Sequence, residues 1–113
     1  MTQTATKPGL EKFSYAKPVP QDRPKVTMGL ARSEVLGMGV QVAKEGGDTN
    51  LHAHAATESL WLVLKGRVRF YDGLDHLFGE FGPLEGLGIP RAAPYWFESA
   101  SDDDLEILHI TGK

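Results

Sequence analysis

Residues 60–73 read LWLVLKGRVRFYDG, and this stretch contains two strand signals, each followed by a turn signal. The first five residues are a strand-sized apolar run of Leu, Trp and Val, which Lys65-Gly66 ends. Val68 and Phe70 then alternate with polar neighbours as far as Asp72-Gly73, a dipeptide that is typical of a turn. The stretch therefore predicts two short strands.

The same pattern continues on both sides of this stretch. Apolar residues stand at every second position from Leu36 to Val42, which is the alternation of a half-buried strand. Gly46-Gly47-Asp48 is a further turn signal. Additional short apolar segments occupy residues 76–81, 87–89, 94–98 and 105–111. No window combines helical periodicity with caps, and the many short strands predict an all-β sandwich or barrel.

Composition agrees with a turn-rich β domain and excludes several functions. The 13 Gly and 7 Pro make 20 of 113 residues, about 18% against an average near 12%. The absence of Cys excludes disulfides, thiolate metal sites, Cys nucleophiles and iron–sulfur clusters. A net charge of -3 argues against nucleic acid as a partner. No apolar run is long enough for a membrane span or a secretory signal, so we expect a cytoplasmic protein.

The length of the chain predicts one domain, preceded by an arm. Prolines at four of the first 24 positions prevent a helix there, so residues 1–25 are predicted to be an extended N-terminal arm. This arm is either a flexible tail or a segment that lies across the body or a partner subunit. Residues 26–113 are predicted to form the barrel.

His52-Ala53-His54 is the strongest local signal for chemistry. On a strand, residues i and i+2 point to the same side, so the two imidazoles would emerge side by side, roughly 7 Å apart at Cα. Glu58 follows closely, and imidazoles with a carboxylate suit Fe, Mn, Ni or Zn. The alternative is a pair of solvated loop histidines.

Residues 46–66 resemble the first motif of the cupins, which runs Gly, five residues, His-x-His, three or four residues, Glu, six residues, Gly. Residues 89–97 resemble the second motif, which centres on Pro-x-Gly and a later His. The resemblance is to small single-domain cupins of the conserved-barrel type. It implies a double-stranded β-helix, or jelly-roll, barrel over residues 26–113, a site inside the mouth of the barrel, and commonly a homodimer.

The second motif is degenerate. Pro90 matches the family, whereas Leu84 and Ala92 occupy its two glycine slots. Tyr95 stands in the slot of a metal-binding His, and Ser99 stands in the Asn slot. The resemblance therefore implies that Tyr95 replaces the fourth metal ligand of the family.

The first motif departs from the family by one residue. Seven residues separate Glu58 from Gly66, where the motif has six. Strand alternation places Ser59 on the face of Trp61 and Val63, and Glu58 on the other face. Glu58 would reach a metal only from a bulge or from the loop before the strand, and an ordinary exposed Glu is the competing interpretation.

Further candidates come from the residues that would face the interior of the barrel. Tyr95 is the candidate catalytic residue, as a metal-bound phenolate or as a proton donor, with a packing role as the alternative. His109 shares a face with Leu105 and Ile107, where it would bind the metal, orient a ligand or be an ordinary core residue. The residues predicted to line the substrate pocket are Trp61, Ser59, Phe97 and His109.

These candidates lead to three function hypotheses. The first is a metal-dependent enzyme acting on a small molecule, with His52, His54 and Glu58 as metal ligands; the family includes dioxygenases, isomerases and lyases. The second is a non-catalytic ligand-binding or sensor barrel. The third is metal-free acid–base chemistry, as in cupin-like sugar epimerases, with His52 or His54 on one side of the substrate and Tyr95 on the other.

Overall fold

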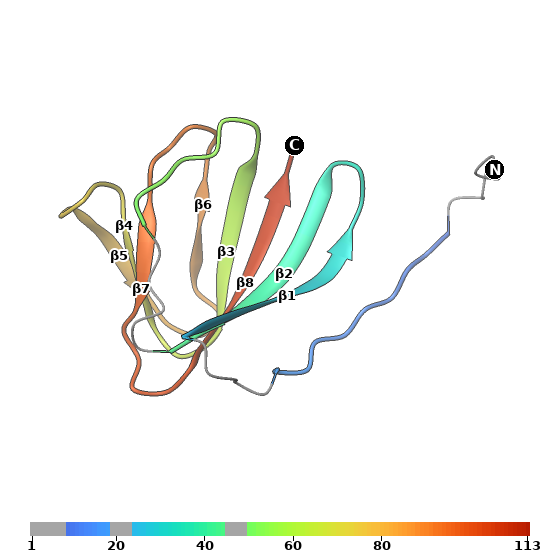
Figure 1. The fold of residues 1–113 in the computed structure, drawn as a ribbon, viewed down its shortest axis with the longest axis horizontal. Helices are drawn as coiled ribbons and strands as arrows, with labels where there is room; N and C mark the ends of the chain where they lie inside the picture. The colour runs from blue at the N-terminus through green and yellow to red at the C-terminus, as the bar shows by residue number, and fades with distance from the viewer. Residues whose placement is uncertain (1–8, 19–23, 45–49) are drawn as a thin grey trace.

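The structure is a computed structural model, and it describes residues 9–18, 24–44 and 50–113. Within these ranges the regular elements are all strands, as Figure 1 shows, which confirms the all-β prediction. The strands are β1 Lys25–Arg32, β2 Leu36–Ala43, β3 Glu58–Lys65, β4 Val68–Tyr71, β5 Leu77–Phe81, β6 Gly86–Ile89, β7 Trp96–Ser99 and β8 Leu105–Gly112. The turn predicted at residues 46–48 lies outside the described residues.

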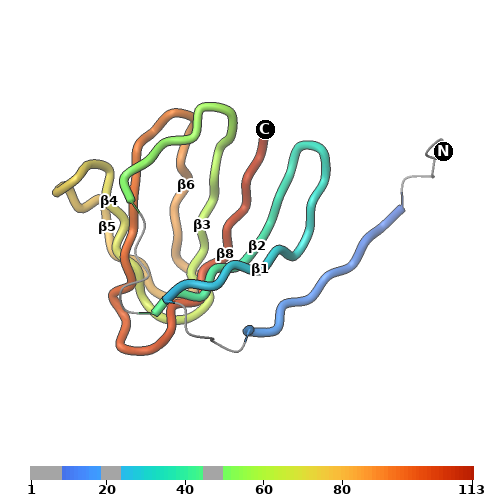
Figure 2. Tube along the Cα trace, in the orientation of Figure 1, coloured from blue at the N-terminus to red at the C-terminus, as the bar shows by residue number. Residues whose placement is uncertain are grey.

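The strands form two antiparallel sheets. One has the order β1-β2-β8-β3-β6 and the other the order β5-β4-β7. Strand β8 pairs with β2 along its whole length, from Leu36 opposite Gly112 to Ala43 opposite Leu105, and pairs with β3 on its other side. Figure 2 traces this arrangement, in which β8 lies between strands that precede it by many residues.

The core lies between the two sheets. In β3 the buried side chains are Ser59, Trp61 and Val63, whereas Leu60 between them is 57% exposed. The sequence alternation separated these residues from Glu58, and the structure shows that the Ser59 face is the inward one. Both sheets contribute to the buried apolar cluster, which consists of Ala43, Trp61, Val63, Val68, Phe70, Ile89, Tyr95, Phe97, Leu105 and Ile107.

The described part of the arm, residues 9–18, is irregular and extends away from the barrel in Figure 1. Its later residues contact the body: the Tyr15 hydroxyl donates to Glu106 Oε1 at 2.6 Å, and Lys17 pairs with Asp104 at 2.9 Å. Burial and the neighbouring Glu106 raise the pKa of Tyr15. Phe13 is 54% exposed, so this part of the arm combines contacts with the body and a projecting apolar end.

Two non-glycine residues adopt the left-handed backbone conformation. Leu84 has a φ of 68° and Ala92 a φ of 67°, and these are the two slots in which the cupin motif has glycine. Hydrogen bonds hold both turns, because the Leu84 amide donates to the Val63 carbonyl at 2.7 Å and the Ala92 amide donates to the His54 carbonyl at 2.8 Å. Both turns thus adopt a backbone conformation that favours glycine, although neither residue is glycine.

Replacing either Leu84 or Ala92 with glycine is expected to stabilise the protein. Relief of the left-handed strain, about 1–2 kcal/mol, exceeds the entropy that glycine adds to the unfolded chain, about 0.4–1 kcal/mol. Urea denaturation should show a gain of up to about 1 kcal/mol for each variant. Ala31→Gly, in β1, is the control and should lose stability; an equal loss in Leu84→Gly and Ala92→Gly would contradict the prediction.

Candidate functional site

The two motif segments meet at the mouth of the barrel. His52 and Tyr95 form an isolated antiparallel bridge, in which the His52 amide donates to the Tyr95 carbonyl at 3.0 Å. The Tyr95 amide donates back to the His52 carbonyl at 2.8 Å. This pair of hydrogen bonds places the His-x-His segment directly beside the segment in which tyrosine replaces the histidine of the family.

The side chains of this bridge gather around the phenol. The ring centroids of His52 and His54 are 5.0 Å apart, and those of His52 and Tyr95 are 4.4 Å apart. The His52 Nδ1 atom lies 2.5 Å from the Asn50 carbonyl, so it donates there as an N–H group. Its Nε2 atom is then the free basic nitrogen, directed by a fixed ring.

A second polar group lies deeper in the barrel. Ser59 is 3% exposed, and its Oγ atom lies 3.0 Å from His109 Nε2. The His109 ring stacks on Trp61 at 3.7 Å with an interplanar angle of 4°, because the register of β3 and β8 makes the two residues cross-strand neighbours. Burial, with smaller contributions from His54 and His52, lowers the pKa of His109 to about 4. His109 is therefore a neutral hydrogen-bonding residue at pH 7.

This lowered pKa makes stability depend on pH. Because the unfolded residue has a pKa near 6.5, the unfolded chain binds more protons than the folded one between pH 6.5 and 4. The contribution of His109 is complete above pH 6.5 and is lost as the pH falls toward 4. After solvent screening of the half-buried ring, we expect a loss of about 1–2 kcal/mol.

Urea denaturation at pH 7 and pH 4.5 measures this loss, with His109→Gln as the test variant. The variant should show a smaller difference between the two pH values than the parent protein. His76→Gln changes an exposed histidine and is the control, which should keep the parental difference. Equal pH differences in the parent protein and His109→Gln would contradict the assignment.

Tyr95 is buried beneath the two histidines, with 4% of its surface exposed. Burial raises the pKa of the phenol, while Ser59 and Trp61, which approach the phenol oxygen, act in the opposite direction. The Trp61 N–H nevertheless has no partner with normal hydrogen-bond geometry among the described residues. With its raised pKa, Tyr95 keeps its proton at pH 7 and can donate a hydrogen bond.

Glu58 lies apart from this group. Its Oε2 atom accepts from Arg91 Nη1 at 3.2 Å, and the two side chains are 61% and 48% exposed. No group of three or more His, Asp or Glu side chains in the described part of the chain is placed to hold a metal ion. With Glu58 turned outward and paired with Arg91, the residues present do not fit the four-ligand metal centre that the cupin resemblance implies.

The other predicted pocket residues lie behind Tyr95. Phe97 is 1% exposed, with its ring 5.1 Å from that of Trp61, and Trp61 itself is 3% exposed. Both pack in the aromatic core, whereas Ser59 and His109 carry polar groups. The structure therefore brings together His52, His54, Tyr95, Ser59 and His109.

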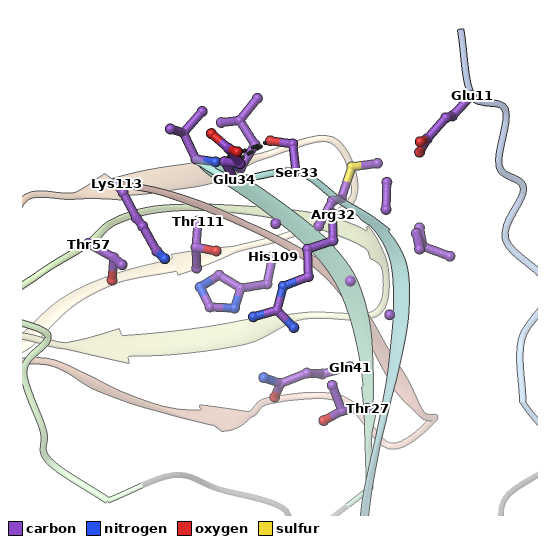
Figure 3. A pocket seen from close by; sticks show the side chains of 18 residues that line it. Glu11, Thr27, Arg32, Ser33, Glu34, Gln41, Thr57, His109, Thr111 and Lys113 are labelled. Atoms are coloured by element: carbon purple, nitrogen blue, oxygen red, sulfur yellow. Dashed lines mark hydrogen bonds between the residues drawn. The ribbon is translucent and has the colours of Figure 1, made fainter. Parts of the chain in front are cut away.

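Sequence reasoning missed a cavity of about 640 Å³ on the inner side of β1 and β2 (Figure 3). His109 and Thr111 of β8 lie on one side of it, and Arg32 and Gln41 lie on the other. The available signal was glycine on the inward faces of β1 and β2: Gly39 stands opposite Gly29, where a Cβ atom would meet nothing within 4 Å.

Comparison with known proteins gives matches of structure only. No family model and no curated protein sequence matches the chain. An RmlC-like cupin protein from Desulfovibrio desulfuricans is 19% identical, with a TM-score of 0.77 over 92% of this chain and 97% of the other. A protein from Klebsiella pneumoniae with a double-stranded β-helix domain is 10% identical, with a TM-score of 0.75 over 84% and 77%.

A cupin 2 conserved barrel domain protein from Leptotrichia buccalis is 24% identical, with a TM-score of 0.71. The match covers 85% of this chain and 44% of that protein. At these identities the likeness shows the fold. The described residues include no helix that is long and apolar enough to cross a membrane.

Proposed function

Because the chain has the double-stranded β-helix fold of the cupins, we propose that it binds a small organic molecule at the mouth of the barrel without a metal ion. His52 and His54 offer imidazole nitrogens to the ligand. Ser59, His109 and Tyr95 form the hydrogen-bonded layer behind them. A few fixed polar groups beside apolar side chains are a usual feature of small-molecule sites.

The single observation that carries this proposal is which face of β3 points into the barrel. Ser59 faces inward and interacts with His109, while Glu58 faces outward and pairs with Arg91. The interior therefore has a neutral hydroxyl where a four-ligand centre requires a carboxylate. A neutral hydroxyl and a neutral imidazole suit hydrogen bonds to an organic ligand better than charge neutralisation of a divalent cation.

Proton transfer at this site would take place from one side of the ligand. The rings of His52 and Tyr95 are 4.4 Å apart and in contact, so a substrate cannot lie between them. The epimerase-like arrangement, with His and Tyr on opposite sides, therefore does not match these positions. His52 Nε2 can accept a proton from the ligand. Tyr95, which keeps its own proton, packs against the His52 ring on the side away from the ligand.

A metal-dependent site is the second candidate, and the two adjacent imidazoles favour it. The Asn50 carbonyl fixes the His52 ring in the way that outer partners orient metal-binding histidines. The ion pair of Glu58 with Arg91 is exposed, so releasing the carboxylate costs only about 0–1 kcal/mol. Here His52, His54 and Glu58 would hold Fe, Mn, Ni or Zn, which supplies Lewis-acid or redox chemistry when bound.

Calorimetric titration with Mn(II), Fe(II), Ni(II) and Zn(II) separates the two candidates, using protein purified without a chelating tag. We expect no saturable site of one metal per chain that depends on Glu58, because its carboxylate lies outside the barrel. Stoichiometric binding that Glu58→Gln and His54→Ala abolish would overturn the metal-free proposal. His76→Ala is the matched control, since it removes an exposed histidine elsewhere on the surface.

A further inference from the structure

Two glycines, Gly29 and Gly39, line the cavity between β1, β2 and β8. Gly29 of β1 stands opposite Gly39 of β2, and both face the interior of the barrel. A Cβ atom on Gly29 would meet nothing within 4 Å, so the space above it is open. With a volume of about 640 Å³, the cavity has the size of a small-molecule site.

Two cationic side chains, Arg32 and Lys113, line this cavity. Arg32 stands opposite Gly37 on the inward face, and Figure 3 shows its guanidinium group extending into the cavity near His109 and Gln41. Lys113 enters from the other side, next to Thr111. Within residues 9–18, 24–44 and 50–113, neither Arg32 nor Lys113 forms an ion pair.

The acidic residues that line the cavity are peripheral. Glu34 lies in the turn between β1 and β2, and Glu11 belongs to the extended arm; Figure 3 shows both away from the Arg32 guanidinium group. The lining as a whole carries two cations and two carboxylates, but the part around the exposed Arg32 guanidinium group is positively charged. Such a charge distribution favours an anionic ligand.

Neutral hydrogen-bonding groups lie beside these cations. The amide oxygen of Gln41 is buried and has no hydrogen-bond partner among the described residues. If the Gln41 side chain rotates so that this oxygen faces the cavity, a ligand hydroxyl can donate a hydrogen bond to it. Buried polar groups normally have such a partner. Thr27, next to Gln41, and Thr111, on the β8 side of the cavity, add hydroxyl groups.

We propose that this cavity binds a small organic carboxylate that also carries hydroxyl groups. The planar Arg32 guanidinium group pairs with the carboxylate, supported by Lys113, and Gln41 and Thr111 bind the hydroxyls. His109 lines the cavity and hydrogen-bonds to Ser59, which connects this cavity to the histidines at the mouth. The inference rests on the proposed function, because it names the ligand class of the same barrel.

Tartrate is the probe, and threitol is its neutral counterpart, with the same four-carbon skeleton and CH2OH groups in place of the two carboxylates. In calorimetric titrations at pH 7 and low salt, tartrate should bind saturably and threitol at least about tenfold more weakly. Arg32→Gln and Lys113→Gln should each weaken tartrate binding by about tenfold or more. Arg69→Gln is the matched control and should bind as the parent does, because Arg69 pairs with Glu80 on the other sheet.

Gly29→Leu tests the location of the ligand. The leucine side chain enters open space, so the variant should unfold at the parental urea concentration but lose tartrate binding. Parental tartrate binding in folded Gly29→Leu, or in Arg32→Gln, would overturn the proposal, as would the absence of tartrate binding. Equal binding of tartrate and threitol would show that the cavity binds a ligand but does not require a carboxylate. The metal titration described above tests the proposed function separately.

Discussion

Replacing Trp61 with alanine is expected to lower the free energy of unfolding by about 3–5 kcal/mol, the largest effect of any change considered for this protein. The indole is 3% exposed and stacks on His109 at 3.7 Å. It also contacts the rings of Phe70 and Phe97, with centroids 5.9 and 5.1 Å away. Its removal would leave a cavity between the two sheets that the surrounding strands cannot close.

Urea denaturation at pH 7 measures this loss, with Leu60→Ala as the matched control. Leu60 is the preceding residue on the same strand, but its side chain is 57% exposed on the opposite face of the sheet. We expect the control to lose about 1 kcal/mol or less. Similar losses in the two variants would contradict the assignment of inward and outward faces in β3.

Gly66→Ala is expected to cost about 2–4 kcal/mol, the second largest effect. Gly66 has a φ of 91°, a region that residues with a Cβ atom rarely adopt. A Cβ atom there would also stand 2.7 Å from Ser101 Oγ and 3.1 Å from the Asp104 carbonyl oxygen. The turn between β3 and β4 therefore requires glycine for its dihedral angle and for its space.

Gly73→Ala is the control for this prediction. A Cβ atom on Gly73 would meet nothing closer than His76 Cβ, at 3.8 Å, which is an ordinary contact. Thermal and urea unfolding should place Gly73→Ala within about 0.5 kcal/mol of the parent. A Gly66→Ala variant as stable as Gly73→Ala would show that the turn relaxes without cost.

Sequence reasoning succeeded where local pattern determines structure. Alternation placed Ser59 and Trp61 on one face of the strand, and the motif located the two slots at which Leu84 and Ala92 take a glycine-like backbone. The adjacency of His52 and His54 also follows from their spacing, and the structure brings their rings to 5.0 Å. These features depend on residues within a few positions of one another.

The rest depends on strand register, which a single sequence does not contain. His109 stacks on Trp61 because β8 pairs with β3 in one particular register, across 48 positions of the chain. The cavity beside Arg32 requires β1 to pair with β2 and to shift its register between Gly29 and Ala31. Neither the stacking nor the cavity has a local signature beyond the glycines themselves.

The central position of β8 has a consequence for how the protein is made. This strand lies between β2 and β3, yet the ribosome synthesises it after all seven other strands. Until β8 emerges, β2 and β3 each have an unpaired edge, and the apolar core lacks Leu105 and Ile107. Folding of the large sheet must therefore wait until β8 has been synthesised.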